Sequence, residues 1–179
     1  MLNRNDALLV FIDVQGKLHE IMPERATLDA NLERMIACAK LLKLPLLVTE
    51  QLPDKLGPTN EPFRTQLSGA TVLSKSAFSC YGEASFKTAL QTTEKNQVIL
   101  VGIETHVCVY QTALDLLADG FEVFVAADAV ASRNPENKTL ALQAMRDAGA
   151  KILPTETLLF ALLRDAADPL FKSVLKLIK

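Results

Sequence analysis

Short aliphatic runs alternate with longer amphipathic segments along the whole chain. Each run contains few charged residues, which is typical of a strand buried on both faces of a parallel sheet. We therefore expect six strands, at Ala7–Ile12, Pro45–Val48, Ala70–Leu73, Val98–Val101, Glu122–Ala126 and Lys151–Leu153.

The segments between these runs place apolar residues three and four positions apart, as on one face of a helix. Gly120 and Gly149 follow two of the segments, in the position where glycine often ends a helix. Alternating strands and helices predict βαβ units with right-handed crossovers. The expected fold is α/β, a three-layer doubly wound (Rossmann-like) sheet of about six mainly parallel strands with helices on both faces. The expected helices are Leu28–Leu42, Ala84–Gln91, His106–Ala118 and Glu136–Ala148.

The length of 179 residues suits one domain with a sizeable core, so we expect a single domain over residues 1–179. The long irregular stretch Gln51–Gly69 follows the second expected strand, and loops of this length are often functional. Residues 168–179 are expected to form a C-terminal helix with one apolar stripe. That stripe can cap the domain or pack on a partner subunit, and capping is the favoured interpretation.

Charge and cysteine content exclude several classes of protein. The formal net charge is −2 and no basic block occurs, so we expect no binding of nucleic acid or of an anionic membrane. No apolar run approaches the roughly 20 residues that cross a bilayer, and the first residues do not resemble a signal peptide. The three cysteines lack C-x-x-C spacing, which indicates neither a disulfide framework nor a zinc knuckle. A cytoplasmic location is expected.

Three residues of complementary chemistry follow three of the expected strands. They are Asp13, Lys75 and Cys108. In an open parallel sheet, sites form beyond the carboxyl ends of the strands, so these side chains are expected to meet there. An acid, a lysine and a cysteine can form a nucleophile with its base, and such a set needs no histidine.

A free thiol has a pKa of about 8.5 and is mostly protonated at neutral pH. Cys108 is expected in the first turn of a helix, where the N-terminal dipole favours a thiolate. The ammonium of Lys75 is expected to lower the thiol pKa further, and Asp13 to accept the proton. Position alone favours structural roles instead: Asp13 capping a turn, Lys75 in solvent and Cys108 packed in the core.

Longer blocks around these residues resemble a known family, the isochorismatase-like hydrolases. The blocks are FIDVQ (Phe11–Gln15), SKSAFS (Ser74–Ser79) and VGIETHVCVYQTALDLLADGFEV (Val101–Val123), followed by ADAVASR (Ala127–Arg133) and AGAKILPTETLLF (148–160). They occur in the family's order, and the stretch from the first block to the last spans most of the chain.

The resemblance implies a catalytic triad of Asp13, Lys75 and Cys108. It also implies a cis peptide bond between Ile103 and Glu104, and an oxyanion hole formed by the backbone amides of Glu104 and Cys108. A non-proline cis bond is rare and usually marks a site.

One departure from the family pattern concerns metal binding. Nicotinamidases of this superfamily carry a D-x-H…H metal site after the second strand, where this chain reads TEQLPDKLGPT (Thr49–Thr59), with Gln51 in place of the Asp. No histidine lies nearby, so we expect no metal and no other cofactor, and nicotinamidase activity is disfavoured. This stretch and the ending DPLFKSVLKLIK instead resemble the subgroup of isochorismatase domain-containing proteins, whose substrates are poorly defined.

Four further residues are candidates for the pocket wall: Gln51, Phe78, Tyr81 and His106. Core packing is favoured for Phe78 and Tyr81. A surface position is about as well supported as a pocket position for His106.

The favoured function is a cysteine-dependent hydrolase that acts on a small amide-type substrate, or a related C–N, ester or vinyl-ether substrate, through a covalent Cys108 intermediate. The alternative is a non-catalytic binding or scaffold protein of the same fold. A dinucleotide-binding function is disfavoured, because DVQGKL after the first strand lacks the G-x-G-x-x-G turn. A homo-oligomer is expected from the resemblance and the apolar C-terminal stripe.

Overall fold

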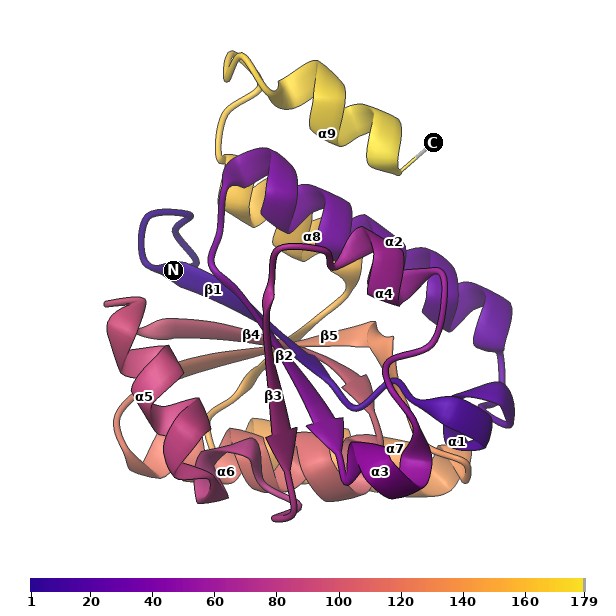
Figure 1. Cartoon of the computed structure of the whole chain (residues 1–179). Coiled ribbons are helices and arrows are strands. Elements are labelled where there is room, and N and C mark those ends of the chain that lie inside the picture. Colours follow the sequence, from indigo (N-terminus) through magenta and orange to yellow (C-terminus); the bar gives the residue numbers. More distant parts are fainter. Residues whose placement is uncertain (179) are drawn as a thin grey trace.

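Six strands form one sheet in which every neighbouring pair is parallel (Figure 1). A computed structural model describes residues 1–178 of the chain. The strands are β1 (Ala7–Ile12), β2 (Leu46–Gln51), β3 (Thr71–Lys75), β4 (Gln97–Ile103), β5 (Glu122–Ala131) and β6 (Lys151–Leu153). Their order across the sheet is β3-β2-β1-β4-β5-β6, so the chain starts in the centre, winds to one edge and then crosses to the other. The predicted doubly wound α/β fold is confirmed.

Helices cover both faces of this sheet (Figure 1). One layer contains α2 (Arg25–Leu42) and α8 (Thr155–Leu163), with α9 (Phe171–Leu177) packed outside α2. The other contains α5 (Ala84–Thr92), α6 (Tyr110–Ala118) and α7 (Pro135–Asp147). Short turns complete the chain: α1 (Gly16–Glu20), α3 (Pro53–Leu56), α4 (Phe63–Gln66), a 3₁₀ turn at Cys80–Gly82 and a π turn at Thr105–Val109.

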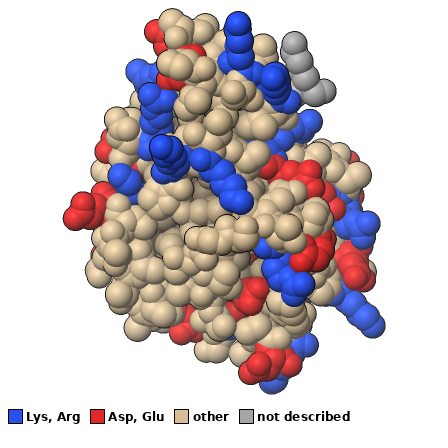
Figure 2. Space-filling view, turned by 45° about the horizontal axis from the view of Figure 1, so that its top comes forward, with Lys and Arg blue, Asp and Glu red and all other residues tan. Residues whose placement is uncertain are grey.

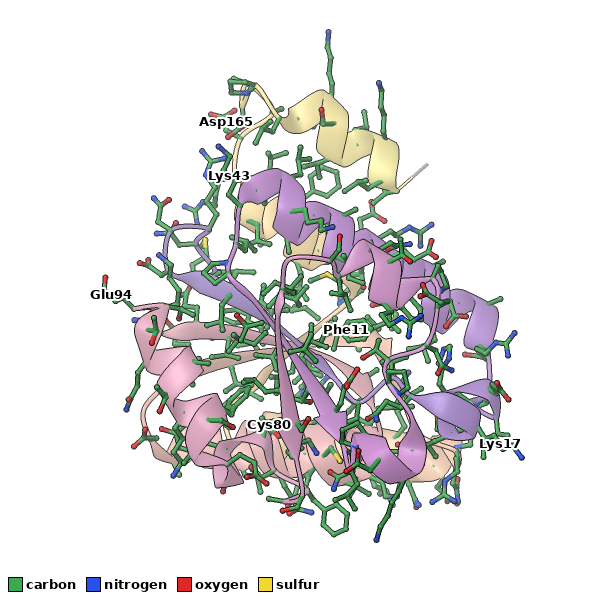
Figure 3. The ribbon with its side chains drawn as sticks, viewed as in Figure 1. Phe11, Lys17, Lys43, Cys80, Glu94 and Asp165 are labelled. Carbon is green, nitrogen blue, oxygen red and sulfur yellow. The ribbon has the colours of Figure 1, made fainter. Side chains whose placement is uncertain are left out.

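Strand β1 divides the core into two halves, because successive side chains of a strand point to opposite faces. Leu9 and Phe11 pack into the half beneath α2 and α8, where Figure 3 labels Phe11. Leu8, Val10 and Ile12 pack into the half beneath α5, α6 and α7. Every residue of β1 is fully buried, which explains its unbroken aliphatic sequence.

The structure differs from the predicted elements at three places. The expected helix His106–Ala118 begins as the π turn and becomes α-helical only at Tyr110. Helix α8 was not predicted, because its TLLFALL sequence is apolar on all sides and lacks a helical period. The stretch Gln51–Gly69 is not wholly irregular, since it contains α3 and α4.

The C-terminal helix caps the domain. Val174 is fully buried, and Arg34 of α2 donates a hydrogen bond from Nε to the carbonyl of Leu177 at 3.0 Å. The helix begins at Phe171 rather than at residue 168, because the Asp168 carboxylate accepts from the amide of Leu170 in the turn before it. Lys179, which closes the predicted segment, lies outside the described residues. Within residues 1–178, no helix combines the length and apolar character needed to cross a bilayer.

Candidate active site

Asp13, Lys75 and Cys108 meet at the carboxyl edge of the sheet. Asp13 directly follows β1, Lys75 is the last residue of β3, and Cys108 lies in the π turn after β4. The Lys75 Nζ atom is 2.6 Å from Oδ2 of Asp13 and 3.6 Å from Sγ of Cys108. All three residues are buried, and Cys108 is the most open of them at 7% exposure. The three side chains that were expected to meet at this edge therefore lie close together.

Close packing of β1 against β4 places the first and last of these residues side by side. Gly102 pairs with Ile12 at the end of β4 and has a φ of 118°. A Cβ atom at Gly102 would stand 2.1 Å from the carbonyl oxygen of Ile12, so only glycine fits there. The strand ends that carry Asp13 and the Cys108 turn can therefore approach each other closely.

The Lys75 ammonium is held by more oxygen atoms than it has protons. Besides Asp13, its partners are the side-chain oxygen of Gln51 at 2.5 Å and the carbonyls of Ala77 and Phe78, each at 3.1 Å. Burial is the largest single influence and opposes the charge, but the charge of Asp13, the two neighbouring cysteines and a hydrogen bond to Asp13 together raise the pKa of Lys75. Lys75 is therefore a fixed, permanently charged group.

The two carboxylate oxygens of Asp13 have different partners. Oδ1 accepts a hydrogen bond from the hydroxyl of Thr49 at 2.7 Å, which orients the carboxylate. Oδ2 has the contact with the Lys75 ammonium and no other donor within residues 1–178. One oxygen is thus committed to holding the carboxylate in place, and the other has lone-pair capacity left for a proton.

The environment of Cys108 raises its pKa to about 12. Burial is the largest cause, the negative charge of Asp13 adds to it, and the charge of Lys75 only partly offsets both. The sequence-based expectation of a preformed thiolate is therefore wrong, since the acid beside the thiol and its burial outweigh the ammonium. At neutral pH the resting group is a thiol whose proton faces a carboxylate.

The turn that carries Cys108 starts at a cis peptide bond between Ile103 and Glu104. The carbonyl of Glu104 accepts from the amides of Val107 and Val109, at 3.1 and 3.2 Å, and the amide of Cys108 between them is not among its donors. The Glu104 side chain points to a different partner, pairing with the guanidinium of Arg133 at 3.0 Å.

The four candidate pocket residues have different positions. Gln51 is buried and binds the Lys75 ammonium directly. His106 bonds the buried Ser132 hydroxyl at 2.9 Å and lines a surface hollow of about 300 Å³ beside α7. Tyr81 packs on Phe121 and bonds Asp119, away from the thiol. Phe78 is 56% exposed, so the core position favoured for it is wrong. Its turn directs the backbone carbonyl to the buried Lys75 ammonium and leaves the side chain outside.

Two buried polar residues near the site were not singled out from the sequence. Gln15 donates to the carbonyls of Gln51 and Gly57 and accepts from the amide of Gln51, which ties the loop after β2 to the end of β1. Thr49 also lies 3.6 Å from the sulfur of Cys80, which Figure 3 shows near the same end of the sheet. Two features of the sequence could have indicated these residues. Gln15 is the last residue of the FIDVQ block, and Thr49 is the first polar residue after an apolar run.

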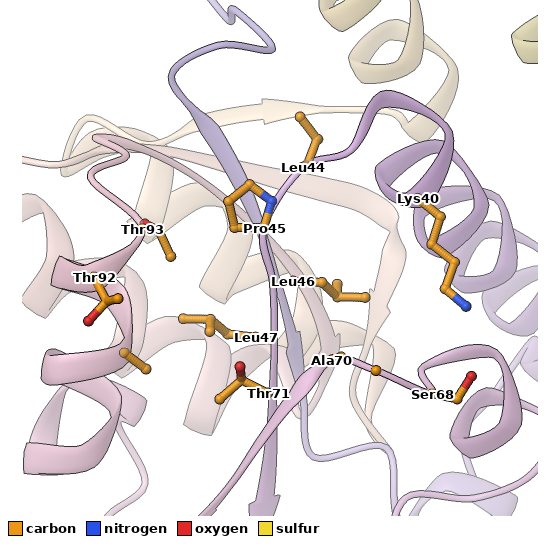
Figure 4. A pocket seen from close by; sticks show the side chains of 12 residues that line it. Lys40, Leu44, Pro45, Leu46, Leu47, Ser68, Ala70, Thr71, Thr92 and Thr93 are labelled. Carbon is orange, nitrogen blue, oxygen red and sulfur yellow. The ribbon is translucent and has the colours of Figure 1, made fainter.

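A hollow of about 740 Å³ lies elsewhere (Figure 4). Leu46, Leu47, Ala70 and Thr71 line it, and they mark the amino ends of β2 and β3. Because ligand sites of open parallel sheets form at the carboxyl ends, this hollow is not the reacting centre. Within residues 1–178, no three His, Cys, Asp or Glu side chains are grouped so as to hold a metal ion.

A family model described as the isochorismatase domain matches residues 7–157, which is most of the chain and includes all three converging side chains. The chain belongs to the isochorismatase family. Isochorismatase domain-containing protein 2A of Mus musculus is 38% identical over 173 residues, covering 97% of this chain and 82% of the mouse protein. The subgroup resemblance found in the sequence is thereby confirmed.

Two solved structures share this isochorismatase fold closely. MAR1 ribonuclease from Caenorhabditis elegans superposes with a TM-score of 0.93 at 34% identity, over 99% of this chain and 91% of its own. YcaC from Escherichia coli, described as an octameric hydrolase of unknown specificity, superposes with a TM-score of 0.93 at 27% identity, over 99% of this chain and 88% of its own. The α/β architecture is therefore that of the isochorismatase family.

The raised pKa of Cys108 gives a prediction about its alkylation. Removing the negative charge of Asp13 in an Asp13→Asn variant lowers the thiol pKa, so iodoacetamide is expected to label Cys108 severalfold faster at pH 8 than in the unmodified protein. In both proteins the rate is expected to rise with pH toward the thiol pKa. Mass spectrometry of timed samples measures the rate, and slower labelling of the variant at every pH would contradict the electrostatic account.

The other two thiols provide internal controls for this measurement. Cys38 and Cys80 are fully buried, and burial raises their pKa values to about 12 and about 11. Both are expected to be labelled only after Cys108 in the folded protein. Equal labelling rates for all three cysteines would show that labelling reports unfolding of the protein rather than the reactivity of the site.

Proposed function

We propose that this chain is a cysteine hydrolase that cleaves a small amide-type substrate, or a related ester or vinyl-ether substrate, through a covalent intermediate on Cys108. The observation that supports this most directly is that the buried Lys75 ammonium lies within 3.6 Å of both the Cys108 thiol and the Asp13 carboxylate. A scaffold protein has no use for a buried ion pair beside a thiol, since burying such a pair seldom adds stability.

In the first step the Cys108 thiol transfers its proton to Asp13 as Sγ attacks the substrate carbonyl. The new S–C bond gives a tetrahedral oxyanion, for which the amides of Glu104 and Cys108 are the proposed donors. The C–N bond then breaks, and the leaving nitrogen takes the proton from Asp13. The product of this step is an amine and a thioester on Cys108.

In the second step water attacks the thioester carbonyl and gives one proton to Asp13. The C–S bond breaks, the carboxylic acid leaves, and the proton returns from Asp13 to the sulfur. Asp13 suits both steps because one oxygen is fixed by Thr49 and the other is open to a proton. Asp13 is free of the transferred proton again at the end of each step, and the second step regenerates the Cys108 thiol.

Lys75 is proposed to act by charge alone. Its nitrogen is engaged by Asp13, Gln51 and two carbonyls, and its raised pKa keeps it protonated throughout. The positive charge stabilises the sulfur anion in the transition state. No metal or cofactor enters this scheme, because Gln51 stands where the metal-binding members of the family carry an Asp.

The decisive experiment is a screen of small amides and esters, with rapid quenching and mass spectrometry of the protein. We expect at least one substrate to add its acyl mass to Cys108 and to be released as the free acid. An RNA that is cleaved while no amide or ester is turned over would contradict the proposal and favour the activity named for the worm protein.

We also propose that residues 1–179 act as one domain and assemble as a homo-oligomer, for which the octameric YcaC gives support. Light scattering at micromolar concentration is expected to give a mass several times that of one chain. A monomer under these conditions would remove this part of the proposal. A reducing compartment such as the cytoplasm suits the chemistry, because the attacking group is a reduced thiol.

A further inference from the structure

Three large apolar side chains stay exposed at the edge of the sheet that carries the site. They are Leu52, Leu56 and Phe78, at 40%, 42% and 56% exposure. Leu52 precedes and Leu56 ends the short helix α3, which follows β2 (Figure 1), and Phe78 lies in the turn after β3. These three residues are named here the apolar rim.

Backbone contacts connect the apolar rim to the reacting groups. The amide of Leu52 donates to the carbonyl of Lys75 at 2.9 Å, and the carbonyl of Phe78 accepts from the Lys75 ammonium. A Cβ atom on Gly16 would stand 2.6 Å from the carbonyl oxygen of Leu56, so the end of α3 rests on the turn that follows Asp13. The rim therefore borders the site on the side of β1, β2 and β3.

The charged groups around the thiol are already paired. Lys75 is neutralised by Asp13, and Arg133 by the bidentate carboxylate of Glu104. The carboxylate of Glu83 is held by the amides of the turn after Lys75, which adds a negative charge at the mouth of the site.

Charges farther out do not restore a positive patch. Asp54 and Lys55 are adjacent and exposed on α3, and their opposite charges cancel. Figure 2 is turned toward the top of Figure 1, and basic side chains gather in its upper half, away from the carboxyl edge of the sheet. Within residues 1–178, a substrate anion would meet the carboxylates of Asp13 and Glu83, while the cations Lys75 and Arg133 are already paired.

Only a small part of a substrate can reach the sulfur, because Cys108 is 7% exposed. The rest of the molecule has to lie outside, against the rim. We infer that the site takes a neutral substrate with an apolar acyl or leaving group, and that Leu52, Leu56 and Phe78 bind this group. The inference rests on the proposed function, and it excludes dicarboxylates such as isochorismate as well as polyanions.

Alkylation of Cys108 tests this preference without requiring turnover. The probes are chloroacetate and the N-methyl, N-butyl and N-benzyl chloroacetamides, each with its rate divided by its rate toward glutathione at the same pH. We expect the corrected rate to rise at least about tenfold from the N-methyl to the N-benzyl amide, as apolar contacts accumulate. Chloroacetate is expected to react at least about tenfold more slowly than the N-methyl amide.

A double variant, Leu52→Ser with Phe78→Ser, is expected to lose most of the N-benzyl over N-methyl preference. Val72→Ser is the matched control, because Val72 is 53% exposed on β3 and stands three residues, roughly 10 Å, before Lys75. This control is expected to keep the preference. Circular dichroism establishes that both variants are folded.

A flat series of corrected rates would overturn the inference, as would faster reaction of chloroacetate or a Cys108 that no chloroacetamide labels. A preference that survives in the double variant would show that other residues bind the apolar group and would also overturn it. These outcomes differ from failure of the proposed function, in which no amide or ester acylates Cys108 although the graded alkylation rates remain.

Discussion

Replacing Cys108 with alanine is expected to abolish hydrolysis, with a loss of roughly 10⁴-fold or more in kcat. Among residues 1–178, no other nucleophilic side chain is placed to replace it: Cys80 is fully buried, and the Lys75 nitrogen is held by Asp13, Gln51 and two carbonyls. The acyl mass on the protein should vanish together with product release.

Cys108→Ser is the matched control, since it keeps the size of the side chain and replaces only the attacking atom. A hydroxyl is much harder to deprotonate than a thiol, and a carboxylate is a weak base, so this variant is expected to be nearly inactive. Substrate binding should remain, measured as inhibition or by calorimetry. Turnover by Cys108→Ala within tenfold of the unmodified protein would remove Cys108 from the mechanism.

Asp13→Asn is expected to lower kcat by roughly 10²–10⁴-fold, the usual range for loss of a general base. The amide keeps the shape of the carboxylate but accepts no proton from the thiol. Because the same change lowers the Cys108 pKa, turnover and alkylation should respond in opposite directions. A loss in kcat below tenfold would show that Asp13 is not the base.

The Asp13→Asn variant is also expected to have a lower free energy of unfolding. Asp13 and Lys75 form an ion pair whose side chains are 4% and 1% exposed, and removing one buried charge costs about 3–5 kcal/mol of unfolding free energy. The double variant Asp13→Asn with Lys75→Met removes both charges and should recover part of that loss in urea denaturation. It should remain inactive, which separates loss of the base from loss of the fold.

The sequence predicted the fold well because the central strands are buried on both faces. A run such as ALLVFI is explained by a central strand with every side chain in the core. It also predicted which side chains gather at the carboxyl edge, because strand ends of a parallel sheet share one side. Helix α8 escaped prediction because its LLFALL sequence is apolar at every position and hides the helical period that its burial follows.

The protonation state of the thiol could not be predicted in the same way. Proximity of Lys75 to Cys108 follows from strand order, but the balance among burial, Asp13 and Lys75 depends on depths and distances of a few ångströms. The same holds for Phe78, because the apolar character of its side chain does not show that the turn directs the carbonyl to Lys75 and leaves the ring exposed.

Strand β3 forms one border of the sheet and is paired only with β2. No side chain of β3 is among the fully buried members of either half of the core, yet Lys75 is its last residue. Detachment of this strand therefore costs less free energy than unfolding of the whole domain, as for other weakly packed borders. On warming, we therefore expect fraying of this border to move the Lys75 ammonium away from the thiol, so that activity is lost below the melting temperature of the domain.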